Sequence, residues 1–137
     1  MEKIPTVNEA LSQMAADGIT DVFIQPTHVI NGIENDIMKA DALKFRDSFD
    51  SISFGVPLLS STQDMEELVH IIIEAFPSLG NDEVLILMGH GSEHYANMAY
   101  AALDYMFKQK GYSQIYVGTV EAYPSLEHIL CGLPGKA

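Results

Sequence analysis

Short apolar segments alternate with longer amphipathic segments along the chain, and this order constrains the fold more than any other feature. Four apolar runs have the length and residue types of strands, and each is followed by a segment with helical periodicity. Strands and helices that alternate in this way form parallel sheets with flanking helices. The sequence therefore predicts an α/β fold, with strands near 20–25, 51–56, 83–88 and 114–120.

Capping residues mark several of the expected helix boundaries. Thr6 and Glu9 have the spacing of a capping box, and Gly18 ends the same segment. Another helix follows a Ser/Thr cap and runs to Pro77. Because Pro, Gly and Asn interrupt two apolar elements at 77–82, we expect this segment to link two parts of the chain.

A helix precedes the first predicted strand, and this order indicates that the α/β units of the chain are incomplete. The chain begins with a helix, whereas doubly wound domains usually lead with a strand at the centre of the sheet. We therefore expect a truncated chain with two partial α/β lobes, one at 1–78 and the other at 79–137.

The composition restricts the partners. The chain has a formal net charge of -12 with only seven Lys and Arg, so nucleic-acid binding, which needs clustered cations, is not expected. The same acidic balance attracts divalent cations. The lone Cys131 fits a reducing compartment, and no apolar run has the length of a membrane span or the form of a signal peptide. We expect a cytoplasmic protein without a membrane partner.

Histidines and a carboxylate follow three of the predicted strands. His28 lies in "QPTHVING", His90 and His94 lie in "MGHGSEH", and Glu121 lies in "GTVEAYP". Because ligands gather beyond the carboxyl ends of parallel strands, we expect these segments to open onto one edge of the sheet. Imidazole and carboxylate together suit a divalent transition metal.

Other interpretations of these residues stay open at this point. "GHGS" before a helix is also suited to holding a phosphate with its N–H groups, although the P-loop lysine is absent. The flanking glycines place His90 in a turn, which disfavours a helical two-histidine metal motif with His94. His70 and His128 fit surface or packing positions.

Four longer segments together carry a resemblance to a known family. They are "QPTHVINGIENDIMK", "GVPLLSS", "MGHGSEHYANMAYAALDYM" and "VGTVEAYPSLE". In this order they resemble the anaerobic cobalt chelatases of the CbiK type, a group of class II tetrapyrrole chelatases. The resemblance implies a chelatase-like two-lobe α/β fold, incomplete in this chain, and insertion of Co²⁺ into sirohydrochlorin in anaerobic cobalamin biosynthesis. It implies Co²⁺ as the substrate metal and no nucleotide or organic cofactor.

The resemblance also assigns roles to two residues. His90 matches the family histidine that serves as metal ligand and proton acceptor, and Glu121 matches the carboxylate that shares the metal. The second metal histidine of the family lies in a "GDHA"-like motif, which this sequence lacks. We therefore expect weak or no activity from this chain alone, with His28 and His94 as reserve ligands. A non-catalytic module that binds metal or tetrapyrrole is the alternative, and we expect either form to be a homo-oligomer.

Overall fold

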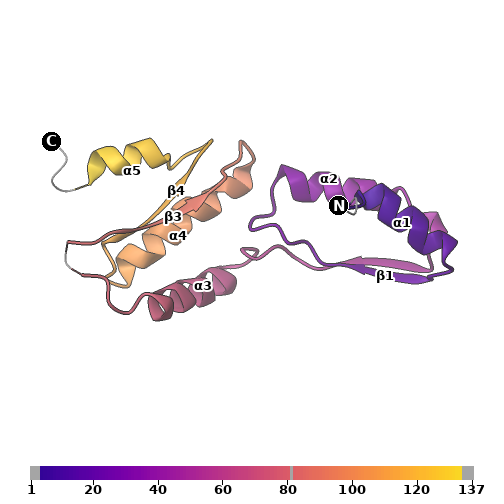
Figure 1. Ribbon diagram of the computed structural model, residues 1–137, viewed down its shortest axis with the longest axis horizontal. Coiled ribbons are helices and arrows are strands. Elements are labelled where there is room, and N and C mark those ends of the chain that lie inside the picture. Colours follow the sequence, from indigo (N-terminus) through magenta and orange to yellow (C-terminus); the bar gives the residue numbers. More distant parts are fainter. Residues whose placement is uncertain (1–3, 81, 134–137) are drawn as a thin grey trace. The chain divides into compact units, whose positions relative to one another are not determined.

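The computed structural model describes residues 4–80 and 82–133, and its helices and strands alternate as the sequence predicts. Each predicted strand is present within two residues of its expected bounds. The described residues form five α-helices, four strands and two short 3-10 helices. Figure 1 shows how these elements follow one another along the chain. The elements are α1 (Val7–Ala16), β1 (Asp21–Ile24), α2 (Ile33–Leu43), η1 (Arg46–Ser48), β2 (Ser51–Phe54), α3 (Thr62–Ala75), β3 (Leu85–Gly89), η2 (Tyr95–Asn97), α4 (Met98–Gln109), β4 (Ile115–Thr119) and α5 (Leu126–Gly132).

The chain divides into two compact units, Met1–Leu58 and Leu59–Ala137. The lobes predicted from the sequence meet between residues 78 and 79, which places α3 in the first lobe. The division by contacts places α3 in the second unit. This helix contacts α4, which lies in the second unit, and its Val69 is fully buried. The identification of the two units as parts of two chelatase-like lobes stays a prediction.

The first unit is a two-stranded parallel sheet with helices packed on it. β1 pairs with β2 in a register that sets Asp21 opposite Ser51. The core residues come from both helices, a strand and the segment before β2: Leu11, Val22, Ala42 and Phe49. The capping box at the start of α1 is confirmed, because the Thr6 side chain accepts from the Glu9 backbone and the Glu9 side chain accepts from the Thr6 backbone.

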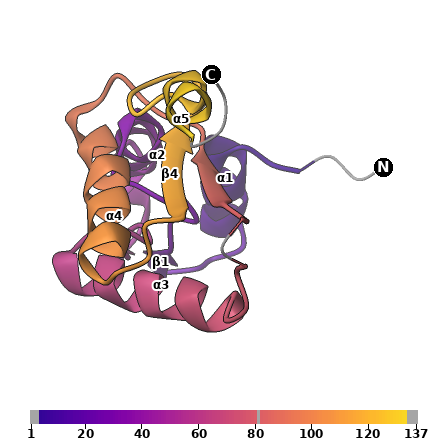
Figure 2. The same ribbon diagram turned by 90° about the vertical axis from the view of Figure 1, so that its left-hand side faces the viewer.

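The second unit contains the other parallel pair, β3 and β4, with Leu85 opposite Ile115 and Gly89 opposite Thr119. Helices α4 and α5 both contact β4, and Figure 2 shows this strand between them. Ile115 and Val117 of β4 are therefore buried, together with Phe107 of α4. The strand ends that carry the predicted site belong to this unit.

The outer edge of β4, which faces away from β3, is occupied by hydrogen bonds from outside the sheet. The Val117 N–H donates to the Asp104 carboxylate at 2.8 Å, and the Thr119 N–H donates to the Pro124 carbonyl at 2.6 Å. The Lys108 ammonium donates to the Ile115 carbonyl. In the described part of the chain, β3 has no strand on its other edge.

None of the helices formed by residues 4–80 and 82–133 is both long and apolar enough to cross a membrane.

Candidate functional site

Backbone hydrogen bonds hold together the loops that follow β3 and β4. The last paired residues of the two strands are Gly89 and Thr119, and the loops continue from them in register. The Val120 N–H donates to the carbonyls of Gly89 and His90 at 3.1 and 3.2 Å, and the Glu121 N–H donates to the His90 carbonyl at 3.0 Å. His90 and Glu121 are therefore neighbours because their strands are adjacent and parallel.

The side chains of these two residues approach each other at the surface. The Nδ1 atom of His90 lies 3.8 Å from the Oε2 atom of Glu121, and the two side chains are 72% and 65% exposed. Nitrogen and oxygen ligands of a transition metal lie about 2 Å from the ion, so two donors in a tetrahedral site are about 3.4 Å apart. In the tautomer with the lone pair on Nδ1, a small side-chain rotation would bring Nδ1 and Oε2 onto one ion.

The His90 ring has a second neighbour that bears on its tautomer. Its Nδ1 atom lies 3.0 Å from the Gly91 carbonyl oxygen. A neutral ring protonated at Nδ1 donates to this carbonyl and carries its lone pair on Nε2. Metal-binding histidines usually orient their rings in this way, with the second nitrogen donating to a carbonyl or carboxylate.

The two glycines beside His90 are required by space and by backbone geometry. A Cβ atom on Gly89 would lie 2.4 Å from the Tyr100 ring of α4. Gly91 has a φ of +89°, and a Cβ there would lie 2.9 Å from the Ala122 backbone nitrogen. The glycines of "GHGS" thus allow close packing around His90. Helix α4 begins only at Met98, after η2, so "GHGS" does not open that helix and the phosphate alternative loses its basis.

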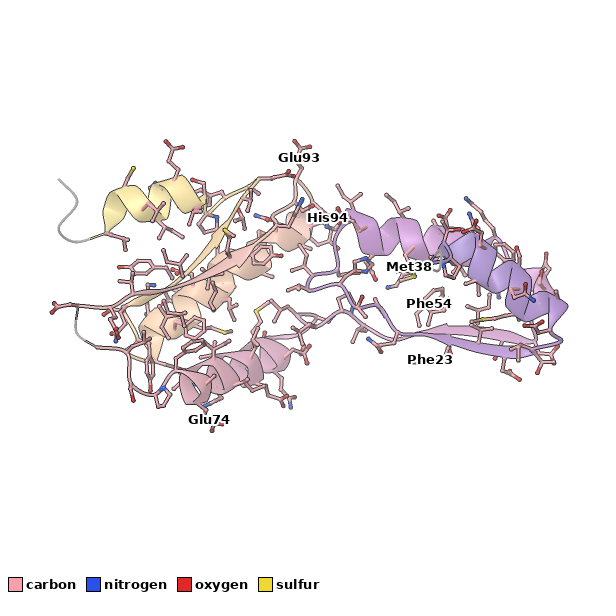
Figure 3. The ribbon with its side chains drawn as sticks, in the orientation of Figure 1. Phe23, Met38, Phe54, Glu74, Glu93 and His94 are labelled. Atoms are coloured by element: carbon pink, nitrogen blue, oxygen red, sulfur yellow. The ribbon has the colours of Figure 1, made fainter. Side chains whose placement is uncertain are left out.

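The two reserve histidines lie outside this pair. His94, in the segment between β3 and α4 shown in Figure 3, accepts a hydrogen bond at Nδ1 from the Ala96 N–H at 3.2 Å and so caps η2. In this arrangement its neutral ring carries the proton on Nε2, which disfavours metal binding there. His28 follows β1, which pairs with β2 in a separate sheet. The expectation that all three strand ends share one sheet edge is therefore wrong for His28.

The pair by itself is a small donor set. Among residues 4–80 and 82–133, no group of three or more His, Cys, Asp or Glu side chains is arranged to hold a metal ion. His90 and Glu121 supply two donors, whereas tight transition-metal sites use three or four. An ion bound here would need further ligands from solvent, substrate or another chain.

Sequence reasoning missed Asn97, which contacts both loops. Its Oδ1 atom accepts from the Ser92 N–H at 2.9 Å, and its Nδ2 atom donates to the Tyr123 carbonyl at 2.6 Å. An Asn just before a helix is typical of a cap, but Asn97 makes no capping bond to α4. The local sequence gives no signal for the longer-range contact with Tyr123.

Comparison with known proteins gives consistent matches. The family model described as cobalt chelatase (CbiK) matches residues 2–136. A sirohydrochlorin cobaltochelatase of Salmonella typhimurium is 38% identical over 130 residues, which cover 95% of this chain and 49% of the relative. The sirohydrochlorin cobaltochelatase CbiKC of Nitratidesulfovibrio vulgaris is 32% identical over 132 residues, covering 94% of this chain and 46% of the relative. The chain thus spans about half the length of these relatives.

Proposed function

Because the chain belongs to the cobalt chelatase (CbiK) family, we propose that it acts in the insertion of Co²⁺ into sirohydrochlorin during anaerobic cobalamin biosynthesis. The observation that carries the proposal is the proximity of His90 and Glu121 at the adjacent ends of two parallel strands. These are the residue types that the chemistry requires, in positions that match the family motifs. The reaction needs no nucleotide or organic cofactor, and we place it in the cytoplasm.

His90 and Glu121 have distinct roles in the proposed reaction. Insertion removes two pyrrole N–H protons while the ion moves from protein ligands to ring nitrogens. His90 can accept one of these protons after it has released the ion, and solvent accepts the other. A neutral imidazole binds a metal ion or a proton through the same nitrogen lone pair, so His90 can serve first as a ligand and then as a proton acceptor. The Glu121 carboxylate supplies charge to hold Co²⁺ and, as one exposed ligand, can release it to the macrocycle. The negative protein charge favours approach of the cation.

The alternative is a module that binds metal or tetrapyrrole without turnover. The presence of only two protein donors, His90 and Glu121, favours this module, because an ion held by so few ligands is poorly guided during its transfer to the macrocycle. Incubating the 137-residue chain with sirohydrochlorin and Co²⁺, while the visible spectrum is followed, separates the alternatives. We expect slow insertion that is abolished by His90→Ala. Binding of Co²⁺ or sirohydrochlorin without any cobalt-containing product would support the module instead.

We further propose that the chain forms a homo-oligomer. Strand β3 (Leu85–Gly89) is apolar, carries no charge and has an unpaired edge in the described part of the chain, whereas the outer edge of β4 is occupied. Unprotected apolar edges favour pairing with another chain. Light scattering at micromolar concentration should therefore show a dimer or larger species. A monomer under these conditions would contradict this part of the proposal.

A further inference from the structure

Asn97 joins the loop that carries His90 to the loop that carries Glu121. The Ser92 N–H, two residues after His90, donates to Asn97 Oδ1, and the Tyr123 carbonyl, two residues after Glu121, accepts from Asn97 Nδ2. A single planar amide therefore joins the two loops at positions two residues beyond His90 and Glu121 in the chain.

The chemistry of the two contacts determines the orientation of this amide. The Ser92 N–H can only donate and the Tyr123 carbonyl can only accept, so the Asn97 oxygen must face Ser92 and its nitrogen must face Tyr123. Aspartate would keep the first contact and set an oxygen against the Tyr123 carbonyl. Alanine would remove both contacts. No other standard side chain of this length both donates and accepts through an amide.

The position of Asn97 in the fold makes the connection rigid. Asn97 directly precedes α4, whose Tyr100 ring is buried against Gly89. Near the strands, the two loops are held by the backbone bonds from Val120 and Glu121 to the His90 carbonyl. The Asn97 amide adds a second point of attachment, two residues beyond His90 and Glu121 in the chain. Movement of one loop relative to the other is thereby restricted on both sides of His90 and Glu121.

We propose that Asn97 is a positioning residue that sets the separation of His90 and Glu121 for binding Co²⁺. This inference rests on the proposed function, since it assigns Asn97 a task in the same site. In this role Asn97 acts through its contacts with the two loops and is not itself a ligand of the ion. Two exposed side chains on loops bind an ion together only when their backbones are restrained, because ordering them otherwise costs conformational entropy.

The test combines Co²⁺ titration with hydrogen exchange on the full 137-residue chain. We expect Asn97→Ala to lower Co²⁺ affinity about tenfold, the scale set by losing two hydrogen bonds, and to speed exchange of the Ser92 N–H by a similar factor. Asn97→Asp should leave the Ser92 N–H protected, because it keeps the acceptor for that group and loses only the donor to Tyr123. Asn8→Ala and Asn8→Asp, on the exposed face of α1, are matched controls that should change neither quantity. Circular dichroism confirms that each variant is folded.

A double variant distinguishes positioning from a general loss of stability. If Asn97 acts through the ligand pair, Asn97→Ala will have no further effect on the weak binding that remains in a His90→Ala background. Normal affinity in Asn97→Ala, with binding still lost in His90→Ala, would overturn the positioning role and leave the proposed function intact. Unchanged Ser92 exchange in Asn97→Ala would overturn the connection itself. Absence of Co²⁺ binding by the wild type would instead contradict the ligand pair, and the positioning role with it.

Discussion

The His90 ring nitrogen Nδ1 and the Glu121 carboxylate oxygen Oε2 lie 3.8 Å apart, although the two residues follow different strands. Their separation is the result of the parallel pairing of β3 and β4, which ends at Gly89 and Thr119. Both side chains are exposed, so the contribution of this pair to stability is small. The pair matters because an imidazole and a carboxylate converge at one surface point.

Removal of the His90 ring should eliminate most of the Co²⁺ binding. His90→Ala leaves a single candidate donor, and one exposed carboxylate binds a transition metal weakly. We expect at least a tenfold loss of affinity, measured by calorimetry. His70→Ala, which removes an exposed imidazole from α3, is the matched control and should bind like the wild type. Equal affinities of the His90→Ala variant and the wild type would disprove the site.

Neutralising Glu121 should weaken binding by a smaller factor. Glu121→Gln keeps the size of the side chain and one carbonyl oxygen but removes the negative charge. We expect a several-fold loss of Co²⁺ affinity that diminishes at high ionic strength, because an exposed charge is screened by salt. Glu127→Gln, also exposed and in the same unit, should leave the affinity unchanged. A similar loss in both variants would indicate a general charge effect instead of a ligand.

A side chain at Gly91 should be more costly than one at Gly111. Both glycines have a positive φ, +89° and +90°, so alanine is strained at either position. At Gly111 nothing lies within 4 Å of an added Cβ, whereas at Gly91 the Ala122 backbone nitrogen lies at 2.9 Å. We expect urea unfolding to show a loss of about 1 kcal/mol for Gly111→Ala and about 2–3 kcal/mol for Gly91→Ala. Equal losses of unfolding free energy in the two variants would mean that the loops around residue 91 move to accommodate the added Cβ without an energetic cost.

Asp104 should stabilise the second unit mainly through β4. Its Oδ1 atom accepts from the Val117 N–H at 2.8 Å and from Lys108 Nζ at 3.1 Å. Asp104→Ala leaves the N–H of a buried strand residue without its acceptor, which costs about 1–3 kcal/mol. Asp104→Asn retains an acceptor for Val117 and should lose less, as measured by urea unfolding. If Asp104→Ala and Asp104→Asn have equal free energies of unfolding, the hydrogen bond from the Val117 N–H does not contribute to stability.

Acid should weaken the first unit through Asp21. Hydrogen bonds from the hydroxyls of Ser51 and, secondarily, Thr20 lower the pKa of this carboxyl from its ordinary value of 3.8. The folded pKa therefore lies below the unfolded one, so the stabilisation is complete above pH 3.8 and is lost as the pH falls through the folded pKa. Ser51→Ala should reduce this acid-dependent loss in thermal unfolding curves. Identical pH profiles for variant and wild type would contradict the assignment.

Short-range signals in the sequence were sufficient for most of the secondary structure. The capping box of Thr6 and Glu9 was predictable because both partners lie within one helical turn. The four strands were predictable from their apolar residues, and their parallel pairing followed from the helices between them. The segments that carry His90 and Glu121 also indicated the family before any contact was known.

The tertiary structure decided which of these segments meet. The predicted lobes already assigned β1 and β3 to different parts of the chain, yet His28 was expected at the same sheet edge as His90, and the pairing of the strands shows that their edges belong to different sheets. The lobe boundary at 78/79 stays a prediction; in the structure α3 contacts α4 and lies with it in the unit Leu59–Ala137. Pairing and packing depend on residues far apart in the chain, so local periodicity does not encode them.

Asn97 illustrates the same division within the site. The residues around Asn97 in the sequence give no sign of a long-range contact, but in the fold its amide joins Ser92 to Tyr123. The sequence by itself determined the residue types available for metal chemistry and the strands that present them. Their distances, and the side chain that connects their loops, were decided only by the fold, because hydrogen bonds between distant segments form when packing brings those segments together.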